Sequence, residues 1–174
     1  MQGSADWLGI NYYTPFRPTL ADPALTQHPE VDAYPGATPV SFVVREPITD
    51  IGWEVEARGL EELLVDTHQR TGLPLVVTEN GAAYADRALV PGDGHVVDDQ
   101  DRIGYLRDHI DATRRARKAG ADVRAYIVWT LLDNFEWAEG YTKTFGIVHV
   151  DPEDQTRTPK ASYRWLVEHL ADSR

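Results

Sequence analysis

The architecture of this chain follows from one segment, Leu73-Pro74-Leu75-Val76-Val77-Thr78-Glu79-Asn80-Gly81, in which an apolar run is closed by polar residues. The apolar part, residues 73–78, is short, rich in β-branched side chains and low in polarity on both faces. This pattern predicts a strand buried on both faces, as parallel strands covered by helices are. Two further runs, Trp7 to Tyr13 and Val123 to Thr130, have the same character.

Helical patterns separate and follow these strands. The first helix is expected near Arg58 to Thr71, before Gly72 as a C-cap residue. The second is expected near Gln100 to Ala119, with basic side chains in its last turns, where they suit the helix dipole. The third is expected from about Pro159, a favoured first-turn residue. The side chains expected to face the core are Leu60, Leu63, Leu64, Thr67, Ile103, Leu106, Ile110, Thr113, Tyr163, Trp165, Leu166 and Leu170.

The resulting order, strand and helix in alternation three times, predicts an α/β fold with a parallel sheet, either doubly wound or closed as a barrel. A (β/α)8 TIM barrel needs about 250 residues, and this chain of 174 residues supplies about three of the eight units. Its outer strands would then have unpaired backbone edges. Such edges favour pairing with a missing half of the barrel or with a second copy of the chain.

Composition excludes several classes of protein. Acidic residues outnumber basic ones 28 to 17, giving a formal net charge of −11, which disfavours nucleic acid as a partner. The chain has no cysteine, so disulfides and thiolate metal sites are excluded and a reducing compartment is favoured. No leader pattern and no run of eighteen apolar residues is present, so we expect a cytoplasmic protein without a membrane partner.

Polar and aromatic residues close each predicted strand. Asn11 and Tyr13 end the first strand, Glu79 the second and Trp129 the third. Long segments follow the strands, residues 14–52, 81–99 and 131–158, as on the active face of a barrel. A carboxylate at the end of an apolar strand costs desolvation energy, so Glu79 is a candidate functional residue. From spacing alone, a loop cap or an ion pair with an arginine explains it equally well.

Three motifs resemble family 1 glycoside hydrolases. They are Trp7-Leu8-Gly9-Ile10-Asn11-Tyr12-Tyr13, Val77-Thr78-Glu79-Asn80-Gly81, and Trp129-Thr130-Leu131-Leu132-Asp133-Asn134-Phe135-Glu136-Trp137. The resemblance runs from about Asp6 to the end of the chain and corresponds to the last three βα units of that family's barrel. It therefore implies that residues 1–174 are a C-terminal fragment of a single TIM-barrel glycosidase domain, a β-glucosidase in type.

The resemblance implies a retaining, double-displacement β-glycosidase that hydrolyses terminal non-reducing β-D-glucosyl residues. Glu79 matches the nucleophile, and Tyr13 matches the tyrosine that hydrogen-bonds and orients it. Asn11 matches a residue near the acid/base. Trp129 would stack on the sugar, and Glu136 and Trp137 would bind its hydroxyl groups.

Two more aromatic residues complete the expected sugar site. Trp53 matches the platform on the leaving-group side, and Phe145 matches the floor of the sugar pocket. The expected substrate is a β-glucoside or a short β-linked oligosaccharide, with a role in cellulose degradation. A phosphorylated sugar is disfavoured because Glu136 would repel it, while glucose, galactose and fucose are not separated by these acceptors.

The family pattern is broken at one decisive point. The acid/base glutamate of the family lies in an Asn-Glu-Pro segment, and this sequence contains none. Loss of general-acid assistance costs about 10² to 10⁴ in rate, so we expect the isolated chain to be nearly inactive or to need a complementing half. The alternative is a non-catalytic half-barrel that binds sugar or assembles with a partner.

No cofactor or metal is expected. His149 and Asp151 form an isolated H-x-D pattern without a third ligand nearby in the sequence. The remaining acids near the motifs are expected to be capping, loop or solvated groups; they are Glu54, Glu56, Asp133 and Glu139.

Overall fold

A three-stranded parallel sheet lies at the centre of the computed structural model, which describes residues 3–20, 40–86 and 97–171. Its strands are β1 (Leu8–Asn11), β4 (Leu75–Asn80) and β5 (Val123–Val128), in the order β1-β4-β5. The register pairs Leu8 with Leu75 and Leu75 with Val123. All three predicted strands, and their parallel direction, are confirmed.

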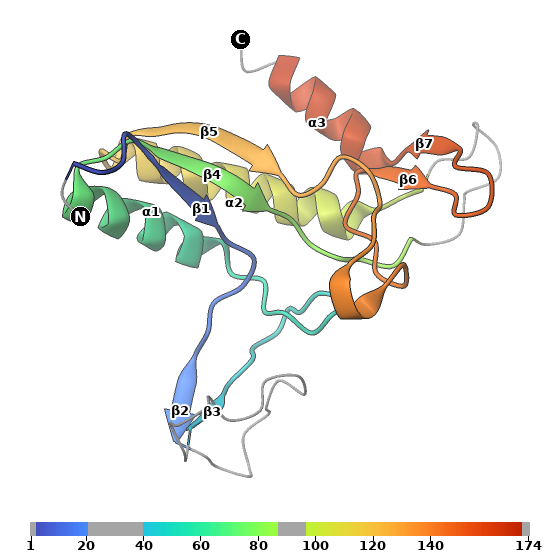
Figure 1. Ribbon diagram of the computed structural model, residues 1–174, viewed down its shortest axis with the longest axis horizontal. Helices are drawn as coiled ribbons and strands as arrows, with labels where there is room; N and C mark the ends of the chain where they lie inside the picture. The colour runs from blue at the N-terminus through green and yellow to red at the C-terminus, as the bar shows by residue number, and fades with distance from the viewer. Residues whose placement is uncertain (1–2, 21–39, 87–96, 172–174) are drawn as a thin grey trace.

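Helices α1 (Ala57–Thr71) and α2 (Gln100–Lys118) lie side by side against one face of this sheet (Figure 1). The side chain of Glu56 caps α1 by accepting a hydrogen bond from the backbone N–H of Arg58 (3.0 Å), as expected of a capping acid. Gly72 ends the helix in the left-handed conformation, with φ of 68°. No helix of the described ranges is long and apolar enough to cross a membrane.

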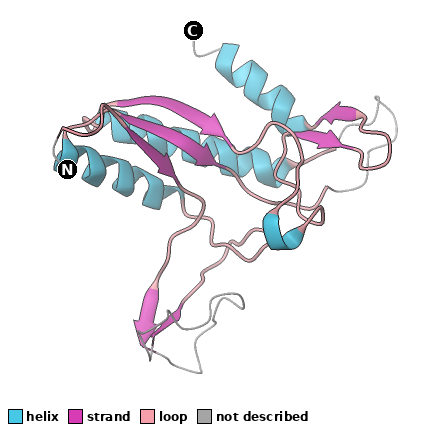
Figure 2. Ribbon diagram, viewed as in Figure 1, coloured by secondary structure: helices cyan, strands magenta, loops and turns pink. Residues whose placement is uncertain are grey.

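Helix α3 (Ala161–Ala171) begins two residues later than predicted. Pro159 is the last residue of β7 (Arg157–Pro159), which pairs with β6 (Val148–Val150) in an antiparallel hairpin. A second hairpin joins β2 (Pro18–Leu20) to β3 (Val40–Phe42) and projects away from the sheet (Figure 2). Neither hairpin was predicted from the sequence. Residues 21–39, in the segment after β1, and residues 87–96, in the segment after β4, lie outside the described ranges.

The main core fills the space between the sheet and helices α1 and α2. It is formed by Tyr12, Leu60, Leu64, Leu75, Val77, Ala116, Ala121 and Val123. A second cluster around Tyr105, Leu106 and Ile147 receives α3 through Tyr163, Trp165 and Leu166. The predicted core positions Leu63 and Leu170 are wrong, since they are 38% and 55% exposed. Neither leucine side chain is covered by another described element of the structure.

The opposite face of the sheet is open, which contradicts the prediction that both faces are buried. Side chains of β5 at Ala125 and Ile127 are exposed, and so is Asn11 of β1. Three strands cannot curl far enough to enclose this face, which in a complete barrel points to the interior. β1 and β5 each pair with a single strand of the sheet, so both outer edges lack a strand partner within the described residues.

A buried polar network joins the end of β4 to α2. Asn80 donates to the carbonyl of Tyr12 (2.6 Å) and to the hydroxyl of Tyr105 (3.0 Å) and accepts a hydrogen bond from Tyr126. The ring of His109 stacks on that of Tyr105 at 3.8 Å, and its Nδ1 contacts the carbonyl of Tyr105. Burial lowers the pKa of His109 to about 4.

His109 therefore predicts a stability that falls with acid. In the folded chain it stays neutral down to about pH 4, whereas in the unfolded chain it takes up a proton below pH 6.5. The unfolded state binds more protons within this window, so its stabilisation is complete above pH 6.5 and is lost as the pH falls. We expect His109 to cost about 3 kcal/mol of unfolding free energy between pH 6.5 and 4.

The measurement is urea unfolding of the wild type and His109→Phe across that pH range. Phenylalanine keeps the stacking on Tyr105 and removes the titrating nitrogen, so the variant should lose less stability in acid. An equal loss of stability in both proteins would contradict the assignment.

Candidate functional site

Glu79 and Tyr13 meet at the carboxyl ends of β4 and β1. The register pairs Asn11 with Glu79, and the backbone N–H of Tyr12 donates to the carbonyl of Glu79 at 3.0 Å. The Tyr13 hydroxyl then donates to Oε2 of Glu79 at 2.7 Å. Burial and, after it, the neighbouring Glu79 carboxylate raise the pKa of Tyr13, so this hydroxyl keeps its proton and acts as a donor.

A pocket of about 500 Å³ opens above this pair. Its walls come from the segments after β1 and β5 and from Glu79 near the end of β4. They are formed by Tyr13, Ile51, Trp53, Glu79, Trp129, Asn134, Phe135, Glu136, Trp137, Ala138 and Glu139. The pocket thus combines flat aromatic rings with three carboxyl groups, which suits a ligand that has apolar faces and a ring of hydroxyl groups.

Glu136 enters the pocket from the segment after β5. Its backbone N–H donates to the carbonyl of Gly140 at 2.7 Å, across the short 3-10 helix η1 (Trp137–Glu139). Burial raises the pKa of Glu136 and the negative charge of Glu79 adds to the shift, while a hydrogen bond with the Trp129 side chain opposes it. Trp137 is 83% exposed at the mouth of the pocket, available to a ligand.

An aromatic cluster supports the side of the pocket that contains Glu79. The ring of Tyr13 meets Trp53 at 5.4 Å and Phe145 at 6.1 Å between centroids, both edge to face. Phe145 is buried behind these rings and does not line the pocket, so it supports the wall and the structure gives it no contact with the sugar space. Phe135, at the pocket wall, was missed although it stands inside the third motif.

Asn11 does not lie in the pocket. It is exposed on the open face of the sheet, where its Oδ1 accepts a hydrogen bond from Thr78 at 2.6 Å. The arrangement holds two strand ends together. It leaves the amide of Asn11 facing the region that further barrel strands would enclose.

Two of the acids expected to be capping, loop or solvated groups are buried in ion pairs. Glu54 accepts two hydrogen bonds from Nε of Arg17 (2.9 and 3.0 Å) and another from the backbone N–H of Arg45. Burial acts to raise the pKa of Glu54, but these hydrogen bonds, led by Arg17, bring it below its usual value. The pair ties the segment after β1 to the residue next to Trp53.

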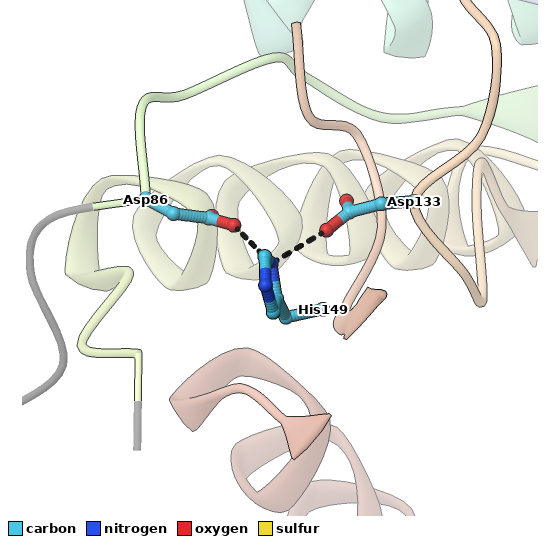
Figure 3. A group of neighbouring side chains, drawn as sticks. All are labelled: Asp86, Asp133 and His149. Atoms are coloured by element: carbon cyan, nitrogen blue, oxygen red, sulfur yellow. Dashed lines mark hydrogen bonds and ion pairs between the residues drawn. The ribbon is translucent and has the colours of Figure 1, made fainter. Parts of the chain in front are cut away.

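The second buried acid, Asp133, lies 3.3 Å from Nδ1 of His149. Asp86 lies 3.1 Å from the same nitrogen (Figure 3). Lys160 bridges both carboxylates. The expectation that His149 has only Asp151 as a nearby acid is therefore wrong. Asp86 comes from the segment after β4, 63 residues away in sequence, so local spacing carried no signal for it.

Comparisons with known proteins agree with this architecture. The sequence matches the model of glycosyl hydrolase family 1 over residues 1–173. It is 44% identical over 171 residues to a bifunctional β-D-glucosidase/β-D-fucosidase of Bifidobacterium breve, covering 96% of this chain and 37% of that protein. It is 42% identical over 162 residues to a 1,4-β-D-glucan glucohydrolase of Thermotoga neapolitana, covering 92% of this chain and 33% of the relative.

Solved structures give the same result. The chain superposes with a TM-score of 0.82 on β-glucosidase from Thermotoga maritima in complex with glucoimidazole, at 37% identity, covering 98% of this chain and 36% of that one. The chain thus spans about a third of the length of the proteins it matches, and it corresponds to the C-terminal portion of their TIM barrel. On this evidence, the chain belongs to glycosyl hydrolase family 1.

Proposed function

We propose that this chain carries the nucleophile and much of the sugar-binding surface of a retaining β-glycosidase of the β-glucosidase type. The observation that supports this most is the 2.7 Å hydrogen bond from Tyr13 to Glu79 at the base of the aromatic pocket. A carboxylate oriented by a hydrogen-bond donor is what attack on an anomeric carbon requires. Tyr13 binds Oε2 of Glu79, so Oε1 is the oxygen proposed to attack.

Glu136, Trp129 and Trp137 are the proposed sugar-binding groups. A carboxylate accepts hydrogen bonds from two adjacent hydroxyls, an indole N–H donates to a third, and an indole face stacks on sugar C–H groups. The relatives are named for glucosides, a fucoside and a 1,4-β-glucan. We therefore propose a β-glucoside or short β-1,4-linked oligosaccharide, such as a breakdown product of cellulose, as substrate. Because the sequence has no cysteine and so no disulfide, we propose the reducing cytoplasm as its compartment.

The general acid is proposed to come from outside these residues. The sequence has no Asn-Glu-Pro segment, and the open face and free edges of the sheet are where further barrel strands would pair. Those strands would come from more of the same protein or from a second chain. The same open face supports the second candidate, a half-barrel that binds sugar and assembles without catalysis.

The first prediction from this proposal concerns complementation. Co-expression with the N-terminal part of a family 1 β-glucosidase that contains Asn-Glu-Pro should produce a complex that cleaves 4-nitrophenyl β-glucoside, at a rate at least about 10² above that of this chain alone. Glu79→Gln should abolish this turnover because an amide is not a nucleophile at carbon. Initial rates measured on the purified complex test it.

Glu139→Gln is the matched control, since it changes another pocket carboxylate to an amide without touching the proposed nucleophile. It should retain most of the activity. Stable assembly without turnover would favour the non-catalytic half-barrel, and equal loss of turnover in both variants would argue against Glu79 as nucleophile.

The second prediction concerns Tyr13. Tyr13→Phe removes one hydrogen bond to a charged group, worth about 1.5–3 kcal/mol. Since the bond orients the nucleophile and does not touch the sugar, we expect kcat of the complemented enzyme to fall about 10- to 100-fold with little change in KM. Tyr84→Phe, a half-buried tyrosine outside the pocket, should leave both constants unchanged. A rise in KM alone would contradict an orienting role.

A further inference from the structure

Three metal-ligand side chains converge outside the glycosidase pocket. Asp86 follows β4, Asp133 follows β5, and His149 lies on β6, so each comes from a different segment (Figure 3). Nδ1 of His149 is 3.1 Å from Oδ2 of Asp86 and 3.3 Å from Oδ2 of Asp133. One ligand atom of each of the three side chains lies within 4.8 Å of the others.

The other oxygens of the two carboxylates are already bound. Lys160, which is fully buried, donates to Oδ1 of Asp86 (2.8 Å) and Oδ1 of Asp133 (3.0 Å). Oδ1 of Asp133 also accepts the backbone N–H of Gly146 at 2.8 Å. These contacts fix both carboxylates so that each presents its Oδ2 to the same imidazole nitrogen. Orientation by outer hydrogen bonds is what metal-ligating carboxylates show in proteins.

The described residues do not supply a hydrogen bond to every polar atom where these three side chains meet. A proton on Nδ1 of His149 can point to one of the two oxygens, and Oδ2 of Asp133, although buried, has no hydrogen-bond partner. The side chain of Asp133 is nine-tenths buried. Lys160 donates to Oδ1 of both carboxylates, so it leaves Oδ2 of Asp133 without a hydrogen-bond donor.

We propose that Asp86, Asp133 and His149 form a binding site for a divalent cation of the zinc type. Zinc binds imidazole nitrogen and carboxylate oxygen at about 2.0–2.2 Å, which places neighbouring ligands of a tetrahedral site about 3.4 Å apart. The two measured separations, 3.1 and 3.3 Å, match this spacing within a few tenths of an ångström. His149 would bind through Nδ1, in the tautomer that carries its proton on Nε2.

The site has an entry path and a fourth coordination position. Asp133 and His149 line a second pocket of about 580 Å³, which shares only Asn134 and Phe135 with the pocket around Glu79. A water molecule from this space would complete the four ligands. The buried ammonium of Lys160 reduces the attraction for a cation, so the site should bind at micromolar rather than nanomolar concentrations.

The cation would act as a clip between segments. It would tie the segment that follows Glu79 to the start of the segment that carries Glu136, and both to β6. This role is structural and does not depend on glycosidase activity. It can therefore be tested on the chain itself.

The test is titration of the chain, freed of metal with EDTA and of any histidine tag, with ZnCl₂ in a calorimeter. We expect saturable binding of one ion per chain. His149→Gln and Asp86→Asn should each weaken it at least tenfold, whereas His68→Gln, a half-buried histidine on α1, should leave it unchanged. Co²⁺ in place of zinc should give the strong visible absorption of tetrahedral cobalt in the wild type and His68→Gln only.

Three results would overturn the proposal. They are the absence of saturable zinc binding to a chain that is folded by circular dichroism, equal affinity in the wild type and His149→Gln, and a cobalt spectrum of the weak octahedral kind. Because circular dichroism is recorded for each variant, loss of binding through unfolding is told apart from loss of a ligand.

Discussion

The parallel pairing of β1 with β4 is the constraint on which the rest of this site depends. It aligns two strand ends so that one backbone hydrogen bond, from Tyr12 to Glu79, and one side-chain hydrogen bond, from Tyr13 to Glu79, act on the same residue. A carboxylate at the end of an apolar strand would otherwise be costly. The pairing therefore offsets the cost of placing Glu79 at the strand end and fixes the orientation of its carboxylate. The pocket forms around this residue.

The same sheet explains why the chain holds only part of a glycosidase site. Helices α1 and α2 cover one face and leave the other open, and neither outer strand has a second partner among the described residues. The residues that face this open side, such as Asn11 and Ile127, are exposed here but would point into a closed barrel. On this proposal, the nucleophile, the aromatic walls and the hydroxyl acceptors lie on one side of the sugar, and the proposed general acid approaches from the side that these strands do not supply.

Sequence patterns were sufficient for the three strands of the sheet and for helices α1 and α2, but not for the two hairpins. Apolar runs located the three strands, and Gly72 marked the end of α1, because burial and capping leave local signals. The motif placed Glu79, Tyr13, Trp129 and Glu136 around one pocket, as the structure does. Hydrophobic periodicity wrongly predicted that Leu63, Leu170 and the second face of the sheet are buried. Burial at these places needs packing partners, and a local sequence pattern does not show whether such partners are present.

Long-range polar contacts were beyond prediction for a different reason. Glu54 looked like a solvated acid until Arg17, 37 residues earlier, was found to bind it, and the hydrogen bond from Asp86 to His149 spans 63 residues. Charge pairs of this kind form only when the fold brings distant segments together. The sequence around a single Asp, Glu or His does not show which distant residue it will pair with. Phe145 shows the same limit for an apolar residue. Its position in the motif did not show whether its side chain lines the pocket or packs behind the residues that do.

The most direct test of the account is covalent trapping of the nucleophile. A 2-deoxy-2-fluoro-β-glucosyl fluoride loses fluoride without needing an acid, so the first displacement can occur in the complemented barrel even when general-acid assistance is weak. Peptide mass spectrometry should find one fluoroglucosyl group on Glu79 and none in Glu79→Gln. A label on Glu136, or turnover of β-glucosides without any label on Glu79, would contradict the central claim.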